Sequence, residues 1–226
     1  MGALHMNALM MSSEVWTVSD KQRQQSSLPR ILDVVLSLLA LAFLSPVLVA
    51  LALVVYLSDG GPALFGQMRL GHDGRRFRCW KFRSMRVDAE ERLQELLSTD
   101  RAALIEWQRN HKLRFDPRIT PLGRFLRESS LDELPQLWNV LKGDMSLVGP
   151  RPIVDAEAQR YGRYFTHYGR VKPGLTGLWQ ISGRSDVSYR RRVAMDVLYV
   201  RRRSTVLYLR ILVATVPAVL LKRGAV

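Results

Sequence analysis

One uncharged segment constrains the fold of this chain more than any other feature. The 24 residues Val34–Leu57, VVLSLLALAFLSPVLVALALVVYL, contain no charged side chain. A helix needs about 20 apolar residues to cross the hydrocarbon core of a bilayer, so this segment is long enough to span a membrane. Ser45–Pro46 stands at its midpoint. A proline inside a helix removes a backbone hydrogen bond and clashes with the preceding turn, so we expect a kink there.

The basic residues on either side of this segment bear on how it meets the membrane. Lys21, Arg23 and Arg30 precede it, and residues 69–86 hold seven Lys or Arg against one Asp. Segments rich in Lys and Arg tend to stay in the cytoplasm. A spanning helix would place one flank outside, whereas a helix that enters, bends and leaves through the same face keeps both inside. Both topologies stay open, and the flanks favour a re-entrant helix-break-helix over residues 29–58.

A second apolar segment lies near the C-terminus. Residues 206–221 are short for a membrane span, contain Arg210 and Pro217, and have basic residues on both sides. We expect an amphipathic helix lying in the membrane interface over about residues 205–222, which would contact anionic lipids. An ordinary core helix with a basic end is the alternative.

The charge of the chain implies an anionic partner. The 226 residues include 34 Lys and Arg against 20 Asp and Glu, a formal net charge of +14. Nucleic acid, an anionic membrane surface and phosphorylated substrates all fit this balance. The aromatic side chains mostly lie in apolar runs rather than among basic residues, so we expect no nucleic-acid partner. Cys79 is the only cysteine, which excludes a disulfide within the chain and fits a reducing compartment.

The remaining sequence divides into a tail and one larger domain. Residues 1–28 begin with MGALHM, which resembles a cloning remnant, and continue as a polar tail that we expect to be flexible. Residues 59–226 are expected to form a catalytic domain on the cytoplasmic face. Within it, residues 60–83 predict a β-hairpin, and residues 87–109 predict an amphipathic helix or helix pair. The predicted fold class is therefore a helix-rich α/β monotopic membrane protein with a small sheet.

Two adjacent acids, Asp132 and Glu133, are the main candidates for chemistry. Pro135 is tolerated only in the first turn of a helix, so the next helix is expected to start around residues 130–132 and to stop at Gly143. Ser130-x-x-Glu133 then reads as a capping box, which explains the acids without any catalytic role. Alternatively, a helix start keeps a carboxylate ionised for nucleophilic attack, and two adjacent acids can hold Mg2+. Capping and catalysis are compatible.

Three arginines just before the acids point to phosphate. Arg118, Arg124 and Arg127 could each bind a phosphate through the forked guanidinium group. Such neutralisation is needed before a carboxylate can approach a pyrophosphate.

Six stretches carry a resemblance to a known family. They are RILD (30–33), SP (45–46), GPALFGQMRLG (61–71), KFRSM (81–85), DPRITPLGRFLRESSLDELPQLWNVLKGDMSLVGPRP (116–152) and KPGLTGLWQISGR (172–184). Together they cover nearly everything from residue 30 onward, and the block over residues 116–152 is highly specific. The chain resembles the bacterial sugar transferase family of monotopic phosphoglycosyl transferases, in particular members that transfer hexose 1-phosphate for exopolysaccharide assembly.

The resemblance implies a reaction and a nucleophile. The family moves a sugar 1-phosphate from a UDP-sugar donor to undecaprenyl phosphate and releases UMP, at the cytoplasmic face of the bacterial inner membrane. Its Asp-Glu pair supplies a nucleophile that forms a covalent phosphosugar intermediate, which implies that Asp132 attacks and Glu133 supports the metal and the geometry. Both acids would hold Mg2+ as cofactor, and Arg127 would meet the polyprenyl phosphate.

The resemblance also suggests the donor side of the site and the membrane topology. The turn Pro150, Arg151, Pro152 is associated with the nucleotide, and Lys81 and Arg83 would serve the donor phosphates. The family uses a re-entrant helix bent at Ser-Pro, as the basic flanks favour here. One departure is Pro29, where many members carry a second basic residue, and this weakens the assignment of that corner to membrane anchoring.

Several properties are left open by the sequence. No residue separates a glucose donor from a galactose donor, and neither the polysaccharide pathway nor a homo-oligomer can be assigned. A non-catalytic membrane scaffold of a polysaccharide assembly complex is the alternative function. It would leave the acidic pair and its arginines without a task.

Overall fold

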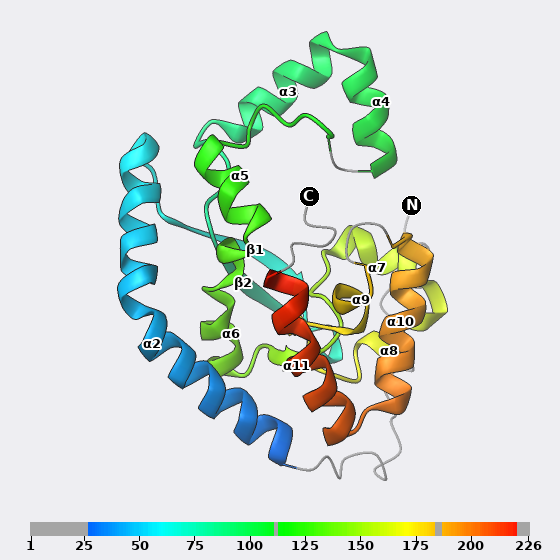
Figure 1. The fold of residues 1–226 in the computed structure, drawn as a ribbon. Coiled ribbons are helices and arrows are strands. Elements are labelled where there is room, and N and C mark those ends of the chain that lie inside the picture. The colour runs from blue at the N-terminus through cyan, green and yellow to red at the C-terminus, as the bar shows by residue number, and fades with distance from the viewer. Residues whose placement is uncertain (1–26, 111–112, 184–186, 221–226) are drawn as a thin grey trace, which may run out of the picture.

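The computed structural model describes residues 27–110, 113–183 and 187–220. It is mostly helical with two small sheets, which confirms the predicted helix-rich α/β class (Figure 1). Nearly all of the predicted flexible tail lies outside the described residues. The elements are α2 (Leu28–Asp59), β1 (Leu64–Leu70), β2 (Arg76–Phe82), α3 (Ala89–Thr99), α4 (Arg101–Asn110), α5 (Pro121–Glu128), α6 (Gln136–Lys142), β3 (Ser146–Val148), α7 (Asp155–Tyr161), α8 (Phe165–Tyr168), β4 (Gly174–Thr176), α9 (Leu178–Ile181), α10 (Tyr189–Arg202) and α11 (Thr205–Leu220).

The apolar segment forms one long helix, α2, with Pro46 inside it. Helix α2 is bent along its length and runs beneath and beside the rest of the molecule (Figure 1). The predicted helix-break-helix is therefore corrected to a single bent helix, because one proline removes only one hydrogen bond and the flanking turns stay helical. Among the described helices, α2 alone is long and apolar enough to cross a membrane. The helix ends at Gly60, whose positive φ of 71° suits a residue without a Cβ.

Both ends of α2 are attached to the same domain, whereas its middle is not. Near its start, Arg30 donates to the carbonyl oxygens of Val140 and Leu141 at the end of α6, at 2.6 and 2.9 Å. At its other end, Asp59 pairs with Arg83 just after β2. Between these attachments, Phe43 is 83% exposed and Ser45–Pro46 is also exposed. The domain thus holds the two ends of the helix and leaves its bend free.

The predicted hairpin is confirmed. Strands β1 and β2 pair antiparallel around a tight turn in which Asp73 has a positive φ of 54°. The register sets Phe65 opposite Lys81 and Gln67 opposite Cys79. Side chains alternate between the faces of a strand, so Cys79 and Lys81 share a face with Arg69. A second sheet, formed by β3 and β4 in parallel, lies beside the hairpin face that carries these residues.

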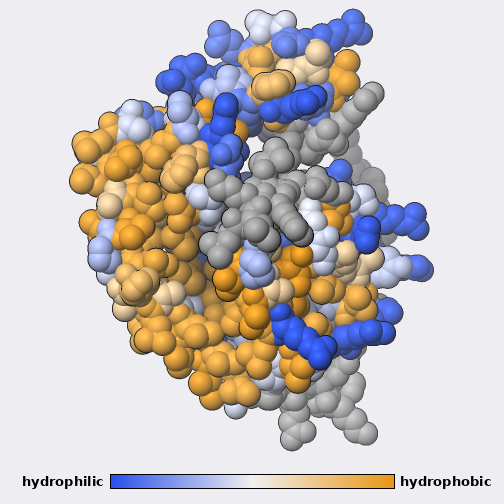
Figure 2. All heavy atoms as spheres, viewed as in Figure 1, coloured by the Kyte–Doolittle hydropathy of each residue, from blue (hydrophilic) through white to orange (hydrophobic). Residues whose placement is uncertain are grey.

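The C-terminal segment forms helix α11, which is buried along one side, and its predicted place in the membrane interface stays a prediction. Tyr208 and Ile211 are buried in the main core, as a core helix requires. The other side of α11 exposes a set of apolar residues that line an open hollow with Arg210 and Pro217: Val206, Leu209, Val213 and Ala214. Apolar side chains continue over the visible surface of α2 (Figure 2). Residues 221 and 222 of the predicted helix lie outside the described residues.

The predicted helix pair is also confirmed. Helices α3 and α4 pack on each other and project from the body of the molecule (Figure 1). Leu93 and Ala103 are the buried apolar residues between them. Trp107 of α4 lies under the guanidinium group of Arg118, 5.0 Å from the ring centroid, and so joins the pair to the segment before α5.

Candidate active site

The acidic pair lies on a single turn of 3-10 helix, Leu131–Glu133, between α5 and α6. Ser130 has a positive φ of 58° and its side chain makes no capping hydrogen bond, so the predicted capping box does not form. Helix α6 begins only at Gln136, because Pro135 fixes its own φ and has no N–H to place inside the helix. The predicted stop at Gly143 is confirmed, with φ of 88°. The acids therefore stand one turn before the helix, with side chains free to face the hairpin.

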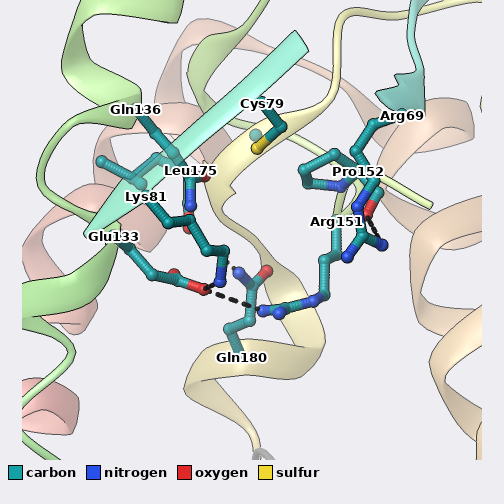
Figure 3. A pocket seen from close by; sticks show the side chains of 10 residues that line it. Arg69, Cys79, Lys81, Glu133, Gln136, Arg151, Pro152, Leu175 and Gln180 are labelled. Atoms are coloured by element: carbon teal, nitrogen blue, oxygen red, sulfur yellow. Dashed lines mark hydrogen bonds and ion pairs between the residues drawn. The ribbon is translucent and has the colours of Figure 1, made fainter. Parts of the chain in front are cut away.

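Lys81 of β2 brings the two acids together. Its Nζ lies 2.7 Å from Glu133 Oε1 and 3.6 Å from Asp132 Oδ2. Arg151, in the turn after β3, approaches the same Oε1 atom from the other side at 3.4 Å (Figure 3). Two cations from different parts of the chain thus converge on Glu133.

Burial and these cations move the pKa values of the two acids in opposite directions. Asp132 is 7% exposed, and burial raises the pKa of its carboxyl group, although Lys81 opposes the rise. Burial would also raise the pKa of Glu133, but Lys81 and Arg151 outweigh it and lower the pKa to about 2. Glu133 is therefore a permanent anion, while Asp132 depends on nearby cations to stay ionised.

Arg127 lies close to Asp132 at the end of α5. Its Nε donates to the Ser84 hydroxyl at 2.8 Å, which fixes the guanidinium group against the residues after β2. Burial lowers its pKa, and Asp132 and Asp116 partly offset this effect. Because a guanidinium group is not deprotonated in proteins, Arg127 remains charged at neutral pH. The structure therefore places Arg127 near Asp132, as predicted, with its Nε held by Ser84.

Three other predicted phosphate-binding arginines are placed elsewhere. Arg118 is buried and holds Asp116 with two hydrogen bonds, at 2.8 and 2.7 Å. Arg124 is exposed on α5. Arg83 pairs with Asp59 at the end of α2 and donates to the Val55 carbonyl. The structure does not bring any of them to the acidic pair, because other carboxylates or the surface occupy them.

The Pro150–Pro152 turn is held tightly from several sides. The Pro150 carbonyl accepts a hydrogen bond from the Gly174 N–H at 2.7 Å, and Arg69 donates to the Pro152 carbonyl at 3.2 Å. A side chain at position 174 would clash with the Gly149 backbone, so glycine is required for this close approach. The fixed backbone directs Arg151 toward Glu133.

A small cavity lies between the hairpin and this turn. Its lining includes three cations and two amides around Glu133 (Figure 3), contributed by Arg69, Lys81, Arg151, Gln136 and Gln180. The Gln180 Nε2 donates to the Leu175 carbonyl at 3.0 Å, while its Oε1 is buried and has no hydrogen-bond partner in the described part of the chain. The excess of positive charge and a free acceptor suit an anionic, hydroxyl-bearing ligand.

Sequence reasoning missed three residues of this cavity. Arg69, Gln136 and Gln180 all fall inside the stretches that carry the family resemblance. Their position within those stretches is the sequence signal that could have identified them as site residues. Which of them face the acids depends on the hairpin register and on the β3–β4 pairing, which no local pattern reveals.

The acidic pair fits Mg2+ only with help from a substrate. The Lys81 ammonium shows that both carboxylates can approach one cation. Within the described ranges no group of three or more acidic, histidine or cysteine side chains could enclose a metal. Mg2+ commonly takes one or two carboxylates and completes its shell with water and substrate phosphates, and these two acids match that pattern.

Comparison with known proteins assigns the chain to a family. A family model described as bacterial sugar transferase matches residues 24–222. A UDP-galactose-lipid carrier transferase of Erwinia amylovora is 50% identical over 92% of this chain and 44% of its own length. An undecaprenyl-phosphate galactose phosphotransferase of Salmonella typhimurium is 50% identical over 90% of the chain and 43% of its own length. The exopolysaccharide production protein ExoY of Sinorhizobium fredii is 48% identical over 87% of both chains. The chain thus spans less than half of the first two relatives.

Proposed function

The chain belongs to the bacterial sugar transferase family, and on this premise we propose that it transfers hexose 1-phosphate from a UDP-hexose to undecaprenyl phosphate, releasing UMP. The name of the Salmonella relative supports undecaprenyl phosphate as the acceptor, and the name of the Erwinia relative supports a UDP-hexose donor. The name ExoY supports a place in exopolysaccharide production. The hexose is galactose or glucose.

One observation carries the proposal: a buried carboxylate is surrounded by cations from separate segments. Lys81 on the hairpin lies 3.6 Å from the Asp132 carboxylate. Burial raises the pKa of Asp132, and the charge of Arg127, at the end of α5, acts to lower it. A carboxylate nucleophile must be ionised to attack, and an anionic donor must be neutralised before it can approach. The same cations serve both needs.

The proposed reaction has two displacements at one phosphorus. First, an oxygen of the Asp132 carboxylate attacks the phosphorus that carries the sugar, and the bond from that phosphorus to the bridging oxygen breaks. UMP leaves with that oxygen. Next, a phosphate oxygen of the lipid attacks the phosphorus of the aspartyl phosphosugar, the bond to Asp132 breaks, and the free carboxylate is restored. Two displacements at the same phosphorus need only one nucleophilic side chain.

The neighbouring residues divide the charge of the two substrates. Arg151 and Lys81 meet the donor phosphates beside the cavity, and Arg127 meets the lipid phosphate. Asp132 and Glu133 would hold Mg2+, which supplies positive charge for the donor pyrophosphate when bound. Arg83 was predicted to bind the phosphates of the UDP-hexose. It already forms an ion pair with Asp59, so it is better explained as a residue that holds the end of α2.

We further propose that α2 is re-entrant and that the domain lies on the cytoplasmic face. A spanning helix separates its ends by the thickness of the membrane, yet Arg30 and Asp59 at opposite ends of α2 both contact this one domain. The exposed bend at Ser45–Pro46 then enters the lipid. The apolar side of α11 lies in the interface, and arginines near its start contact anionic headgroups.

The direct test is release of UMP. Purified full-length chain in detergent, with undecaprenyl phosphate and Mg2+, should release UMP from UDP-galactose or UDP-glucose and from few other nucleotide sugars. When the lipid is left out and the donor carries a radiolabel in its hexose, labelled hexose 1-phosphate should become covalently bound to the protein. A chain that releases UMP only in a ternary complex, with no labelled protein, would contradict the covalent route. No UMP from any hexose donor would contradict the proposed function itself.

A further inference from the structure

Lys81 lies between the two acids of the pair. Its ammonium group lies 2.7 Å from Glu133 Oε1 and 3.6 Å from Asp132 Oδ2, so it bridges the two carboxylates that we propose as Mg2+ ligands. Lys81 is largely shielded from solvent, with 24% of its side chain exposed. An ion pair in such a setting is screened less than one on the surface.

Glu133 is engaged twice in this arrangement. Its Oε1 accepts from Lys81 at 2.7 Å and from Arg151 at 3.4 Å. A divalent ion that binds at the same oxygen meets the positive charge of both side chains, and this repulsion weakens its binding unless one of them moves away.

Lys81 also lines the cavity together with Arg69 and Arg151, so an anion bound there would lie near its ammonium group. An ammonium group on a flexible four-carbon stem can move from a carboxylate to a phosphate without a change in the backbone. Its destination would be the phosphate of the bound donor.

We propose that Lys81 is a resident counter-ion that makes Mg2+ binding conditional on the donor. In the free protein it neutralises Asp132 and Glu133 and competes with the metal. When the nucleotide sugar binds, its phosphates accept Lys81 and release the two carboxylates, so metal and donor enter together. This inference rests on the proposed function for the identity of the donor, but the competition between Lys81 and the metal does not require turnover.

The test measures metal binding without any donor. The affinity of the purified full chain for Mn2+ is determined from the free-ion signal in electron paramagnetic resonance, with Mg2+ as competitor. Removing a cation this close to two carboxylates should change their affinity for another cation by about tenfold or more. We therefore expect Lys81→Gln to bind Mn2+ roughly tenfold more tightly than the native chain.

A matched control comes from the same strand. Arg78 is exposed on β2 and stacks over Trp80, and the alternation of the strand directs it to the opposite face from Lys81. Arg78→Gln removes the same charge without touching the acids, so its Mn2+ affinity should equal that of the native chain. Lys81→Met serves as a second variant, and circular dichroism checks that each variant is folded.

A second measurement tests the movement of Lys81 to the donor. With saturating Mg2+, UDP should bind more weakly to Lys81→Gln than to the native chain, by about tenfold. Tighter Mn2+ binding together with weaker UDP binding supports the proposal. Unchanged Mn2+ affinity in both Lys81 variants overturns it, even if the native chain releases UMP. Unchanged UDP affinity overturns the transfer to the donor, and a native chain without UMP release would instead contradict the proposed function.

Discussion

Two buried aspartates are held in different ways. Asp132 is surrounded by cationic side chains, chiefly Lys81 and Arg127. Asp33, in the first part of α2, is 3% exposed and is held by neutral donors instead. One of its oxygens accepts from the Ser146 hydroxyl at 3.0 Å, the Leu147 N–H at 2.8 Å and the Tyr208 hydroxyl at 2.7 Å.

The difference separates a site that exchanges partners from one that fixes the fold. An ammonium group on a flexible side chain, such as that of Lys81, can leave a carboxylate for a phosphate or give way to a metal. Backbone N–H groups and buried hydroxyls cannot, so Asp33 joins α2 to β3 and α11 permanently. Four changes, to three carboxylates and to Lys81, would sharpen or break the comparison.

The largest effect is expected for Asp132→Asn. An amide cannot act as the nucleophile, so UMP release should fall by more than about a thousandfold. The fold should persist, because burial already raises the pKa of Asp132 and a neutral side chain suits the site. Turnover and circular dichroism measure the two outcomes. A variant that retains most of its activity would remove Asp132 from the role of nucleophile.

Asp33→Ala should act on stability first. The change leaves three buried donors without an acceptor. We expect the free energy of unfolding to fall by roughly 3 kcal/mol, or Tm to fall by about ten degrees. Asp33→Asn keeps an acceptor oxygen and is the matched control, with a smaller loss. Thermal unfolding in detergent measures both. Equal losses for the two variants would show that the charge of Asp33, and not its acceptor geometry, holds the helix.

Lys81→Gln should shift the pH dependence of turnover. Only the ionised form of Asp132 attacks, so the rate falls as the pH drops through the pKa of Asp132. Lys81 lowers that pKa against the rise caused by burial. Its removal should therefore move the acidic limb of the rate profile to higher pH. The limb is measured as kcat/KM against pH at fixed Mg2+, because this ratio reports the free enzyme, in which Lys81 lies beside Asp132. A limb that stays in place would show that Lys81 does not control the ionisation of Asp132.

The smallest effect is expected at Asp196, for which the described residues show one hydrogen bond, from Tyr161, where Asp33 accepts three. Its Oδ2 accepts from the Tyr161 hydroxyl at 2.7 Å, and burial raises its pKa to about 7. The folded state therefore keeps a proton that the unfolded chain releases above about pH 4, and stability declines as the pH rises from there to about 7. Asp196→Asn should lack this decline and be more stable at pH 8 by a few degrees in Tm. Parallel pH profiles for the two proteins would contradict the assignment.

Features that depend on neighbouring residues were predicted from the sequence, whereas contacts between distant residues were not. The apolar helix, the hairpin and the helix pair were predicted because each depends on a local pattern of residues. The capping box at Ser130 was wrong, since Glu133 bonds to Lys81, 52 positions away along the chain, rather than to its own backbone. The donor role of Arg83 was weakened by Asp59, a partner that no local pattern indicated.

By itself the sequence determined that a long apolar helix with an internal proline precedes a basic domain with an acidic pair. These features follow from composition, proline geometry and short spacings, all of which are local. The tertiary structure decided which cations reach Asp132 and Glu133, and that Arg30 and Asp33 attach one end of the helix to the domain that also holds the other. Such contacts join residues separated by dozens of positions, so they exist only once the sheet register and the packing of the helices are set.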